Sequence, residues 1–325
     1  MPDYSRDYSI SHDTDAKSCT IRFRCFDTPN SVTVYGFGNH EDAESALLDV
    51  RRKCLELHLL WSFSLVGSEI SRINDRGRRI EIGFDTAALI GAMKDFHERE
   101  PMFDFTIGPL SYLWKRASRL PSESEVERAL KHVGASKVRL EAPFLDAGGA
   151  DVRFAVVKED ELLQIDIGGA AKGYAADYIA NHIRSCGFGS ANIDLGGNLY
   201  MLGTHPTGRP WRVSIRVPEG LPVSKTVVEV VDKSVVTSGR YERFVEIGGK
   251  RYQHIVDPMT GWPSESDIVS ATVESDSSIL GDMLATTALL VGSKGLDALC
   301  DRHRTCDFIA ITADGAVLRP RLASS

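Results

Sequence analysis

The chain has 325 residues, of which 42% are hydrophobic and 26% are charged, proportions that exclude collagen, a coiled coil and global disorder. Its length fits roughly two domains or two closely packed lobes. The 45 acidic side chains outnumber the 38 basic ones and give a net charge of −7. Because an acidic chain without large basic clusters lacks the surface that nucleic acids require, we expect no nucleic-acid partner.

The start of the chain indicates a location inside the cell. Residues 1–20 are polar, carry charges of both signs and contain no apolar segment of the kind found in secretory signals. We therefore expect a flexible N-terminal segment over 1–20 and a cytoplasmic protein. No stretch approaches the roughly 18 apolar residues of a membrane helix, so no membrane span is predicted. The six cysteines lack CxxC spacing, which indicates free thiols.

The first half of the chain shows clear helix and strand signals. Alternating β-branched residues predict a strand over 31–36, and Asn39 is a suitable cap for a long helix over 41–61. Apolar residues recur along that helix with the spacing of one face packed on a sheet. A capping-box sequence at 122–125 begins a second helix, which is expected to end at Gly134.

The second half of the chain mixes further helices with short strands. A third helix follows the glycine pair Gly168-Gly169 and ends at Gly187, and a fourth contains residues 282–290. Strands are predicted at 191–195, 211–217, 226–231, 268–273 and 308–312. Since helices and strands do not alternate strictly and no linker divides the chain, we expect an α+β fold of two intertwined lobes.

Two glycine-rich segments carry possible binding chemistry, DIGGAAKG at 166–173 and DLGGN at 194–198. Each follows an apolar stretch with the character of a strand, and glycines at a strand-to-helix junction let backbone N–H groups approach a phosphate. Neither segment has the Walker A or GxGxxG sequence, which excludes those two nucleotide-binding motifs. On sequence alone, each segment is equally well explained as a tight turn needed for packing.

Three polar residues later in the chain are candidates for catalysis. Asp282 and Thr286 are four residues apart on the fourth helix, so their oxygens leave the same face about one turn apart, as Mg²⁺ ligands would. The simpler interpretation is an aspartate near a helix start and a threonine bonded back to its own helix. His254 begins the sequence HIVDPMTG and could exchange a proton at a sheet edge, although a lone histidine is more often structural.

The order and spacing of eight motifs resemble the ApbE family of FAD:protein FMN transferases, over nearly the whole chain. In chain order the motifs are FDT at 26–28, SEISRIN at 68–74, DFTIGPL at 104–110, DIGGAAKGYAAD at 166–177, IDLGGN at 193–198, TSGRYE at 237–242, HIVDPMTG at 254–261 and GDMLATTALLVG at 281–292. Any one of these motifs is weak evidence. All eight in this order are hard to obtain by chance.

The resemblance implies an ApbE-like α+β fold, a single domain over 21–325 whose two intertwined lobes hold the flavin site between them. It implies Mg²⁺ bound by Asp282, by Thr286 and by a backbone carbonyl of the glycine turn, that of Gly169. It implies His254 beside the flavin phosphate. The family positions that line the FAD site correspond to Phe26, Met102, Phe103, Asp104, Asp166, Lys172 and Val256. The chain departs from common members at Ser64, Met283 and Thr287.

The activity that the resemblance implies is a Mg²⁺-dependent transfer of FMN from FAD to a threonine or serine hydroxyl of an acceptor protein. AMP would be the leaving group and His254 the candidate general base. The acceptor would carry a short Ser/Thr-containing flavinylation motif. A Mg²⁺-dependent FAD pyrophosphatase would use the same residues with water as the nucleophile. The alternative from another class is a flavin-binding protein without chemistry.

Overall fold

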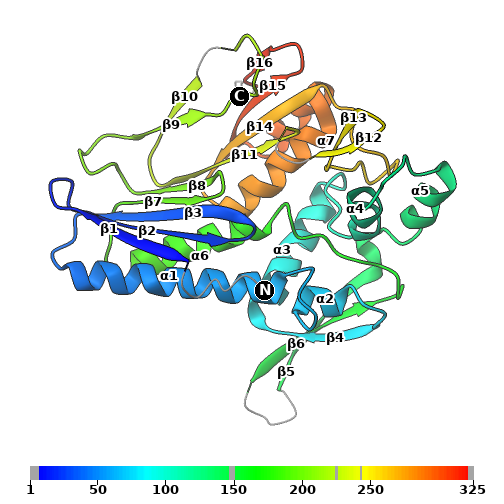
Figure 1. Ribbon diagram of the computed structural model, residues 1–325, viewed down its shortest axis with the longest axis horizontal. Coiled ribbons are helices and arrows are strands. Elements are labelled where there is room, and N and C mark those ends of the chain that lie inside the picture. Colours follow the sequence, from blue (N-terminus) through cyan, green and yellow to red (C-terminus); the bar gives the residue numbers. More distant parts are fainter. Residues whose placement is uncertain (1–6, 146–150, 224–225, 242–243, 321–325) are drawn as a thin grey trace.

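The computed structural model describes residues 7–145, 151–223, 226–241 and 244–320 and is built around one large antiparallel sheet (Figure 1). Among the described residues this sheet has nine strands in the order β1-β2-β3-β7-β8-β11-β14-β15-β16. Their bounds are β1 (Tyr8–Asp13), β2 (Ser18–Cys25), β3 (Thr28–Tyr35), β7 (Ala191–Leu195), β8 (Asn198–Leu202), β11 (Lys233–Gly239), β14 (Ile268–Ser275), β15 (Asp307–Thr312) and β16 (Val317–Leu318).

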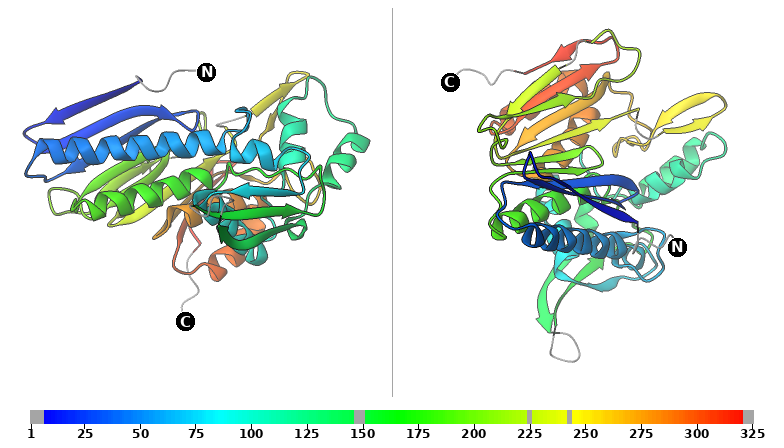
Figure 2. Two further views of the ribbon diagram at one scale, coloured as in Figure 1. Left: turned by 90° about the horizontal axis from the view of Figure 1, so that it is seen from below. Right: turned by 60° about the vertical axis from the view of Figure 1, so that its left-hand side comes forward.

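One face of this sheet is covered by the helices α1 (His40–Trp61), α6 (Ala171–Ser185) and α7 (Ser278–Arg302) (Figure 2). The stripe predicted for α1 is the face it buries, with Ala43, Ala46, Leu47, Val50, Cys54 and Leu57. The predicted cap is confirmed as well, since the Asn39 side chain accepts a hydrogen bond of 3.0 Å from the Glu41 N–H. The sequence pattern therefore fixes both the start of α1 and its orientation on the sheet.

The opposite face of the sheet is covered by a hairpin of β9 (Trp211–Ile215) and β10 (Thr226–Val230). Successive strand residues point to opposite faces. Val235 accordingly packs with this hairpin, whereas its neighbour Val236 packs with the helices. The sheet is thus buried on both sides where the hairpin crosses it.

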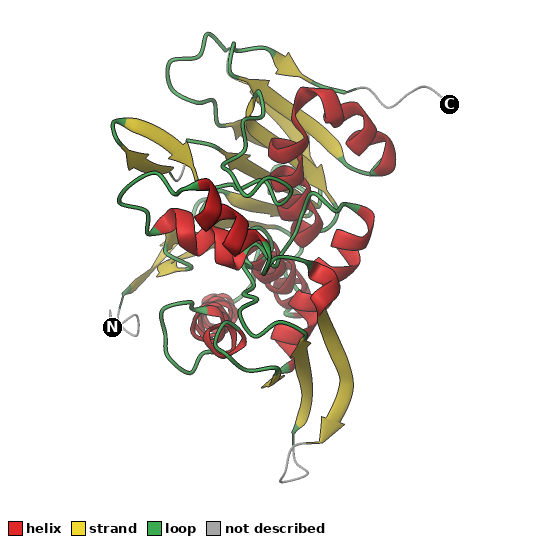
Figure 3. Cartoon of the chain, turned by 90° about the vertical axis from the view of Figure 1, so that its right-hand side faces the viewer, coloured by secondary structure: helices red, strands yellow, loops and turns green. Residues whose placement is uncertain are grey.

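The second lobe contains a three-stranded sheet in the order β4-β6-β5 and several shorter helices (Figure 3). Its elements are α2 (Glu69–Ile73), β4 (Arg79–Ile82), α3 (Phe84–Arg99), α4 (Gly108–Lys115), α5 (Glu123–Leu130), a 3₁₀ turn (Ala135–Lys137), β5 (Val138–Leu145) and β6 (Val152–Lys158). A hairpin of β12 (Phe244–Ile247) and β13 (Lys250–Gln253) lies beside α4 and α5. Because the chain enters this lobe after α1 and returns to the large sheet at α6, the two lobes are intertwined, as predicted.

The prediction of a flexible segment over 1–20 is wrong for the part that the structure describes. Strand β1 pairs with β2 in register, with Tyr8 opposite Phe23 and Asp13 opposite Ser18. Cys19 and Ile21 of β2 are buried, which anchors the pair in the core. The polar sequence of β1 reflects its exposed position at the edge of the sheet. The remainder of the predicted segment, residues 1–6, lies outside the described residues.

Helix α7 is longer than the sequence predicted. It continues to Arg302 across a break at Gly292, whose φ of 68° is unfavourable for any residue with a side chain. By length and composition it could cross a membrane, although no membrane span was predicted. This is weak evidence for a span, because 56% of its most apolar window is buried and a core helix meets the same criterion. The six cysteines are all free, as predicted.

Helices α6 and α7 make a close contact at Gly173. A Cβ atom on Gly173 would lie 2.5 Å from the Ser278 carbonyl oxygen and from the Ile279 Cα. Four residues further along α6, Asp177 accepts hydrogen bonds from the N–H groups of Ser278 (2.6 Å) and Ile279 (3.0 Å). Asp177 thus caps α7 from outside that helix, and the two helices are locked together at this point.

We expect Gly173→Ala to lower the free energy of unfolding by about 3 kcal/mol, because the added methyl group meets backbone atoms that cannot move aside individually. Urea unfolding followed by circular dichroism measures this change. Gly189→Ala is the control, since a Cβ atom there has open space around it. Equal stabilities of the two variants would contradict the close contact.

Candidate functional site

The first glycine-rich motif follows a segment that is extended but belongs to no sheet. Within the described residues 163–167 there is only an isolated bridge between Gln164 and Ile107, so the strand predicted before Gly168 is wrong. Backbone hydrogen bonds join Asp166 N–H to the Phe105 oxygen (2.8 Å) and Gly108 N–H to the Gln164 oxygen (3.1 Å). The segment is held by loops of the second lobe and leads into α6 of the first.

The glycine turn meets the late helix, as the resemblance to the ApbE family implied. Gly169 lies so close to α7 that a Cβ atom on it would be 3.2 Å from Thr286 Oγ1 and 3.0 Å from the Phe103 ring. Asp166 Oδ1 accepts a hydrogen bond of 2.9 Å from Gly168 N–H and closes the turn. The structure therefore brings together Gly169, Thr286 and Phe103, which are far apart in the sequence.

Asp282 lies one helical turn before Thr286, is 2% exposed and faces the start of α6. Its Oδ2 accepts a hydrogen bond of 3.1 Å from Gly173 N–H, and its Oδ1 lies 3.7 Å from Lys172 Nζ. A buried carboxylate requires such partners. The carboxylate, the Thr286 hydroxyl and the nearby Gly169 backbone form a set of hard oxygen donors, which is the chemistry that Mg²⁺ accepts. The predicted ligand residues fit the ion in donor type, and their role stays a prediction.

Among the described residues, no three His, Cys, Asp or Glu side chains lie together in a way that could hold a metal ion. The predicted Mg²⁺ site differs from such a cluster, because only one of its three ligands, Asp282, is a side chain of these types. A cavity of about 980 Å³ lies between β10 and strands β14 and β15, away from the glycine turn. We assign it no part in the candidate site, because it contains none of the predicted residues.

Asp166 is mostly buried, and neighbouring polar and charged groups stabilise its ionised form. Burial by itself raises the pKa of this carboxyl group, but the Lys115 ammonium 3.4 Å away, the Gly168 N–H and the Ser111 hydroxyl lower it, and the net pKa lies below its ordinary value. The folded-state pKa is thus lowered. The ionised carboxylate therefore stabilises the fold above the ordinary aspartate pKa of about 3.9, and this contribution is lost as the pH falls through the lowered pKa.

We expect Lys115→Met to raise the pKa of Asp166, because burial would then be opposed by fewer favourable charges. A titration of the side-chain carboxyl resonance by carbon NMR measures the pKa directly. Lys131→Met, which removes an exposed lysine from the same lobe, is the control. A pKa of Asp166 that stays unchanged in Lys115→Met would show that the ammonium has no influence.

Aromatic side chains line the path from the first strands to α6. Phe26 stacks on Trp61 with ring centroids 6.5 Å apart, and Trp61 meets Tyr174 edge to face at 5.4 Å. Tyr174 follows Gly173 directly, so Phe26 lies in a cluster that reaches the first turn of α6. Phe103 is buried against Phe96 and lies close to Gly169 of the glycine turn. Two of the predicted flavin-site aromatics thus lie near the start of α6.

Other predicted residues lie near this region in different roles. Met102 is half-buried beside Phe103. Asp104 Oδ1 accepts hydrogen bonds from both the N–H (2.8 Å) and the hydroxyl (2.6 Å) of Thr106, so this oxygen stabilises its own turn. Val256 is buried in the cluster of α4 and α5 rather than among the contacts of the glycine turn.

The segment that carries His254 bridges the two lobes. Trp114 of α4 donates a hydrogen bond of 2.9 Å to the Gly261 oxygen, and Ser264 donates one of 3.3 Å to the Leu289 oxygen of α7. His254 is half-buried at the beginning of this segment. Of the motif TSGRYE, Glu242 lies outside the described residues, whereas Gly239 ends β11.

Two residues that support the site were not predicted from the sequence. Asn74 hydrogen-bonds both backbone groups of Ile165, and Lys158 is buried nearby. Asn74 belongs to the SEISRIN motif, which was a usable signal. Lys158 belongs to none of the motifs, and nothing in its neighbouring sequence distinguishes it from other lysines.

Solved structures of other proteins share the fold described above. The flavin transferase ApbE from Vibrio cholerae has the same fold, with a TM-score of 0.81 and 22% identity over 94% of this chain and 97% of that chain. The ApbE protein of Thermotoga maritima gives a TM-score of 0.79 at 25% identity, with 97% of each chain covered. The α+β fold of two intertwined lobes is therefore the fold of flavin transferases.

Sequence comparison then gives the family. The profile of the ApbE family matches residues 26–310. A FAD:protein FMN transferase of Treponema pallidum is 30% identical over 302 residues, which are 88% of this chain and 82% of that protein. A protein of the same name from Haemophilus influenzae is 26% identical over 295 residues, 87% of this chain and 81% of that protein. The chain belongs to the ApbE family.

Proposed function

We propose that this chain is a FAD:protein FMN transferase, the activity named for its relatives. The observation that carries the proposal is the contact between the glycine turn and α7, where Gly169 approaches Thr286 one helical turn from the buried Asp282. A helix N-terminus preceded by glycines suits an anionic phosphate group. In this chain α6 begins at Ala171, directly after that turn.

In the proposed site, Asp282, Thr286 and the Gly169 carbonyl would hold Mg²⁺, which supplies charge neutralisation at a diphosphate when it is bound. Lys172, close to Asp282, adds a second positive charge at the start of α6. Phe26, through its cluster with Trp61 and Tyr174, and Phe103, through its contact with Gly169, place aromatic side chains near this position, the kind of surface that an isoalloxazine ring requires. The residues thus combine anion binding with an aromatic environment.

The proposed reaction transfers the FMN phosphoryl group to a hydroxyl of the acceptor protein. A threonine or serine oxygen attacks the FMN phosphorus and forms a phosphoester bond. The bond from that phosphorus to the AMP oxygen breaks, and AMP leaves with the electron pair. The proton of the hydroxyl passes to His254, which we propose as the general base.

The function is tested by incubating the protein with FAD and Mg²⁺, with and without an acceptor that carries a Ser/Thr flavinylation motif. The expected result is FMN attached to Thr or Ser of the acceptor, seen by mass spectrometry, with AMP formed in quantity only when the acceptor is present. Equal AMP formation without acceptor would indicate a pyrophosphatase instead. FAD binding with neither product would leave a flavin-binding protein and overturn the proposal.

A further inference from the structure

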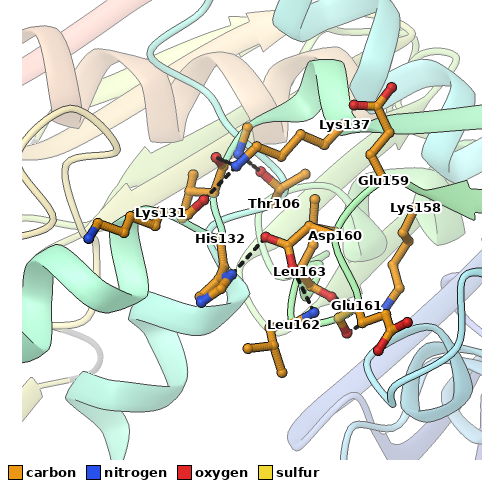
Figure 4. A network of polar contacts seen from close by, with 12 residues as sticks. Thr106, Lys131, His132, Lys137, Lys158, Glu159, Asp160, Glu161, Leu162 and Leu163 are labelled. Atoms are coloured by element: carbon orange, nitrogen blue, oxygen red, sulfur yellow. Dashed lines mark hydrogen bonds and ion pairs between the residues drawn. The ribbon is translucent and has the colours of Figure 1, made fainter.

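Lys158, the last residue of β6, is a buried lysine whose contacts serve the segment before the glycine turn. Its side chain is 1% exposed. Burial lowers its pKa, an effect that nearby carboxylates only partly oppose. The ammonium group nevertheless has partners, because its Nζ donates hydrogen bonds to backbone carbonyl oxygens of two separate chain segments. Figure 4 shows the lysine with one of these segments, residues 161–163. A charge enclosed in this way needs several such partners to be tolerated.

The two segments that Lys158 joins are 73–75 and 161–163. Its Nζ lies 2.6 Å from the Ile73 oxygen and 2.8 Å from the Asp75 oxygen, on either side of Asn74. It lies 3.0 Å from the Leu163 oxygen and 3.4 Å from the Glu161 oxygen. A single ammonium group therefore connects the end of α2 to the chain that approaches the glycine turn.

Asn74, whose backbone neighbours are bound by Lys158, in turn binds the backbone of Ile165. Its Oδ1 accepts a hydrogen bond of 2.7 Å from Ile165 N–H, and its Nδ2 donates one of 2.9 Å to the Ile165 oxygen. The side chain thus replaces the neighbouring strand that residues 163–167 lack. The following residue, Asp166, closes the turn at Gly168. A shift of 73–75 against 161–163 would therefore be transmitted to Asp166 and the glycine turn.

We propose that Lys158 is a positioning residue of the FAD site, acting as an internal cation that fixes Asn74 and, through it, Asp166 and the glycine turn. This inference rests on the proposed function for the identity of the ligand. The four converging carbonyl oxygens resemble a site for a monovalent cation, in which carbonyl dipoles replace the hydration shell. Removing the lysine side chain would leave this carbonyl cage open to a small external cation.

The test compares Lys158→Ala with Lys137→Ala. Lys137 belongs to the same polar network and also donates to backbone oxygens, those of Lys131 (2.5 Å) and Val133 (3.0 Å), but it contacts the end of α5 instead of 161–163 (Figure 4). FAD affinity is measured by calorimetry in choline chloride, then with methylammonium or potassium chloride added. We expect Lys158→Ala to bind FAD roughly 10- to 100-fold more weakly in choline, with most of the loss restored by a small cation. Lys137→Ala should change less than about twofold and show no recovery.

Two outcomes would overturn the inference: unchanged FAD affinity in Lys158→Ala, or a weakened affinity that no small cation restores. Asn74→Asp provides a second variant that keeps the lysine. Its carboxylate still accepts from Ile165 N–H but cannot donate to the Ile165 oxygen, so a similar loss of FAD affinity is expected. Wild-type affinity in Asn74→Asp would contradict the proposed route from Lys158 to Asp166.

Amide hydrogen exchange separates this inference from the proposed function, because it needs no ligand. Without FAD, the Ile165 and Asp166 amides should exchange faster in Lys158→Ala than in the wild type, and methylammonium should slow them again. Unchanged protection would overturn the inference whatever the protein binds. FAD binding without FMN transfer in the wild type would overturn the proposed function and leave the positioning role of Lys158 intact.

Discussion

Replacing Asp282 with alanine is expected to abolish Mg²⁺-dependent FMN transfer. Asp282 supplies the only carboxylate among the three proposed ligands, and Thr286 with a backbone carbonyl is a poor site for a hard divalent cation. The substitution also removes the partner of Lys172 and the acceptor of the Gly173 N–H. Calorimetric titration of Mg²⁺ into the FAD-loaded variant measures the loss, and wild-type Mg²⁺ affinity would refute the assignment.

The control for this experiment has to separate lost metal binding from lost packing. An unpaired buried N–H costs about 1–3 kcal/mol, so Asp282→Ala could reduce activity through the contact between α6 and α7 alone. Asp282→Asn keeps an oxygen that can accept from Gly173 N–H and removes the charge. We therefore expect Asp282→Asn to unfold at a urea concentration close to that of the wild type and still fail to transfer FMN. Full activity of Asp282→Asn would show that the carboxylate charge is not required.

The elements that the sequence predicted are those with local signals. Helix α1 has an apolar stripe and a capping asparagine, and the capping box at Ser122 is present with both of its hydrogen bonds. Strand β1 could not be predicted in this way, because its exposed edge position allows a polar sequence. Helix α3 has Gly83 as its N-cap, which offers no side-chain hydrogen bond, so only the buried stripe marks this helix in the sequence. Local chemistry thus reveals elements that have caps or one apolar face, and edge strands escape it.

The candidate site shows the same division between local and long-range information. The helical spacing of Asp282 and Thr286 follows from sequence, and the resemblance to a family suggested that Gly169 meets them. The pairing of Asn74 with Ile165 joins positions 91 residues apart and depends on the path of the chain between the lobes. Lys158 likewise donates to the Ile73 oxygen, 85 residues before it in the sequence. Such contacts are set by the tertiary structure and leave no periodic pattern in the sequence.

His254→Ala is expected to keep FAD affinity and to lose FMN transfer by roughly 10²- to 10⁴-fold, the range for removal of a general base. His254 is half-buried, and the next residue, Ile255, accepts a backbone hydrogen bond of 3.0 Å from Ser264, which is itself bonded to α7. The backbone should therefore stay in place when the ring is removed. Single-turnover transfer to an acceptor protein, measured by mass spectrometry, gives the rate. His182→Ala, on the far end of α6, is the matched control and should transfer at the wild-type rate.

The dependence of transfer on pH gives a second readout that a purely structural histidine would not move. A general base must be unprotonated to accept the proton, so the wild-type rate should fall as acid protonates that base. In His254→Ala the residual rate should no longer show this fall in acid, which is the acid limb of the pH profile. Added imidazole should restore part of the transfer. A variant that transfers FMN as fast as the wild type, or that keeps the same acid limb, would assign the proton to another acceptor.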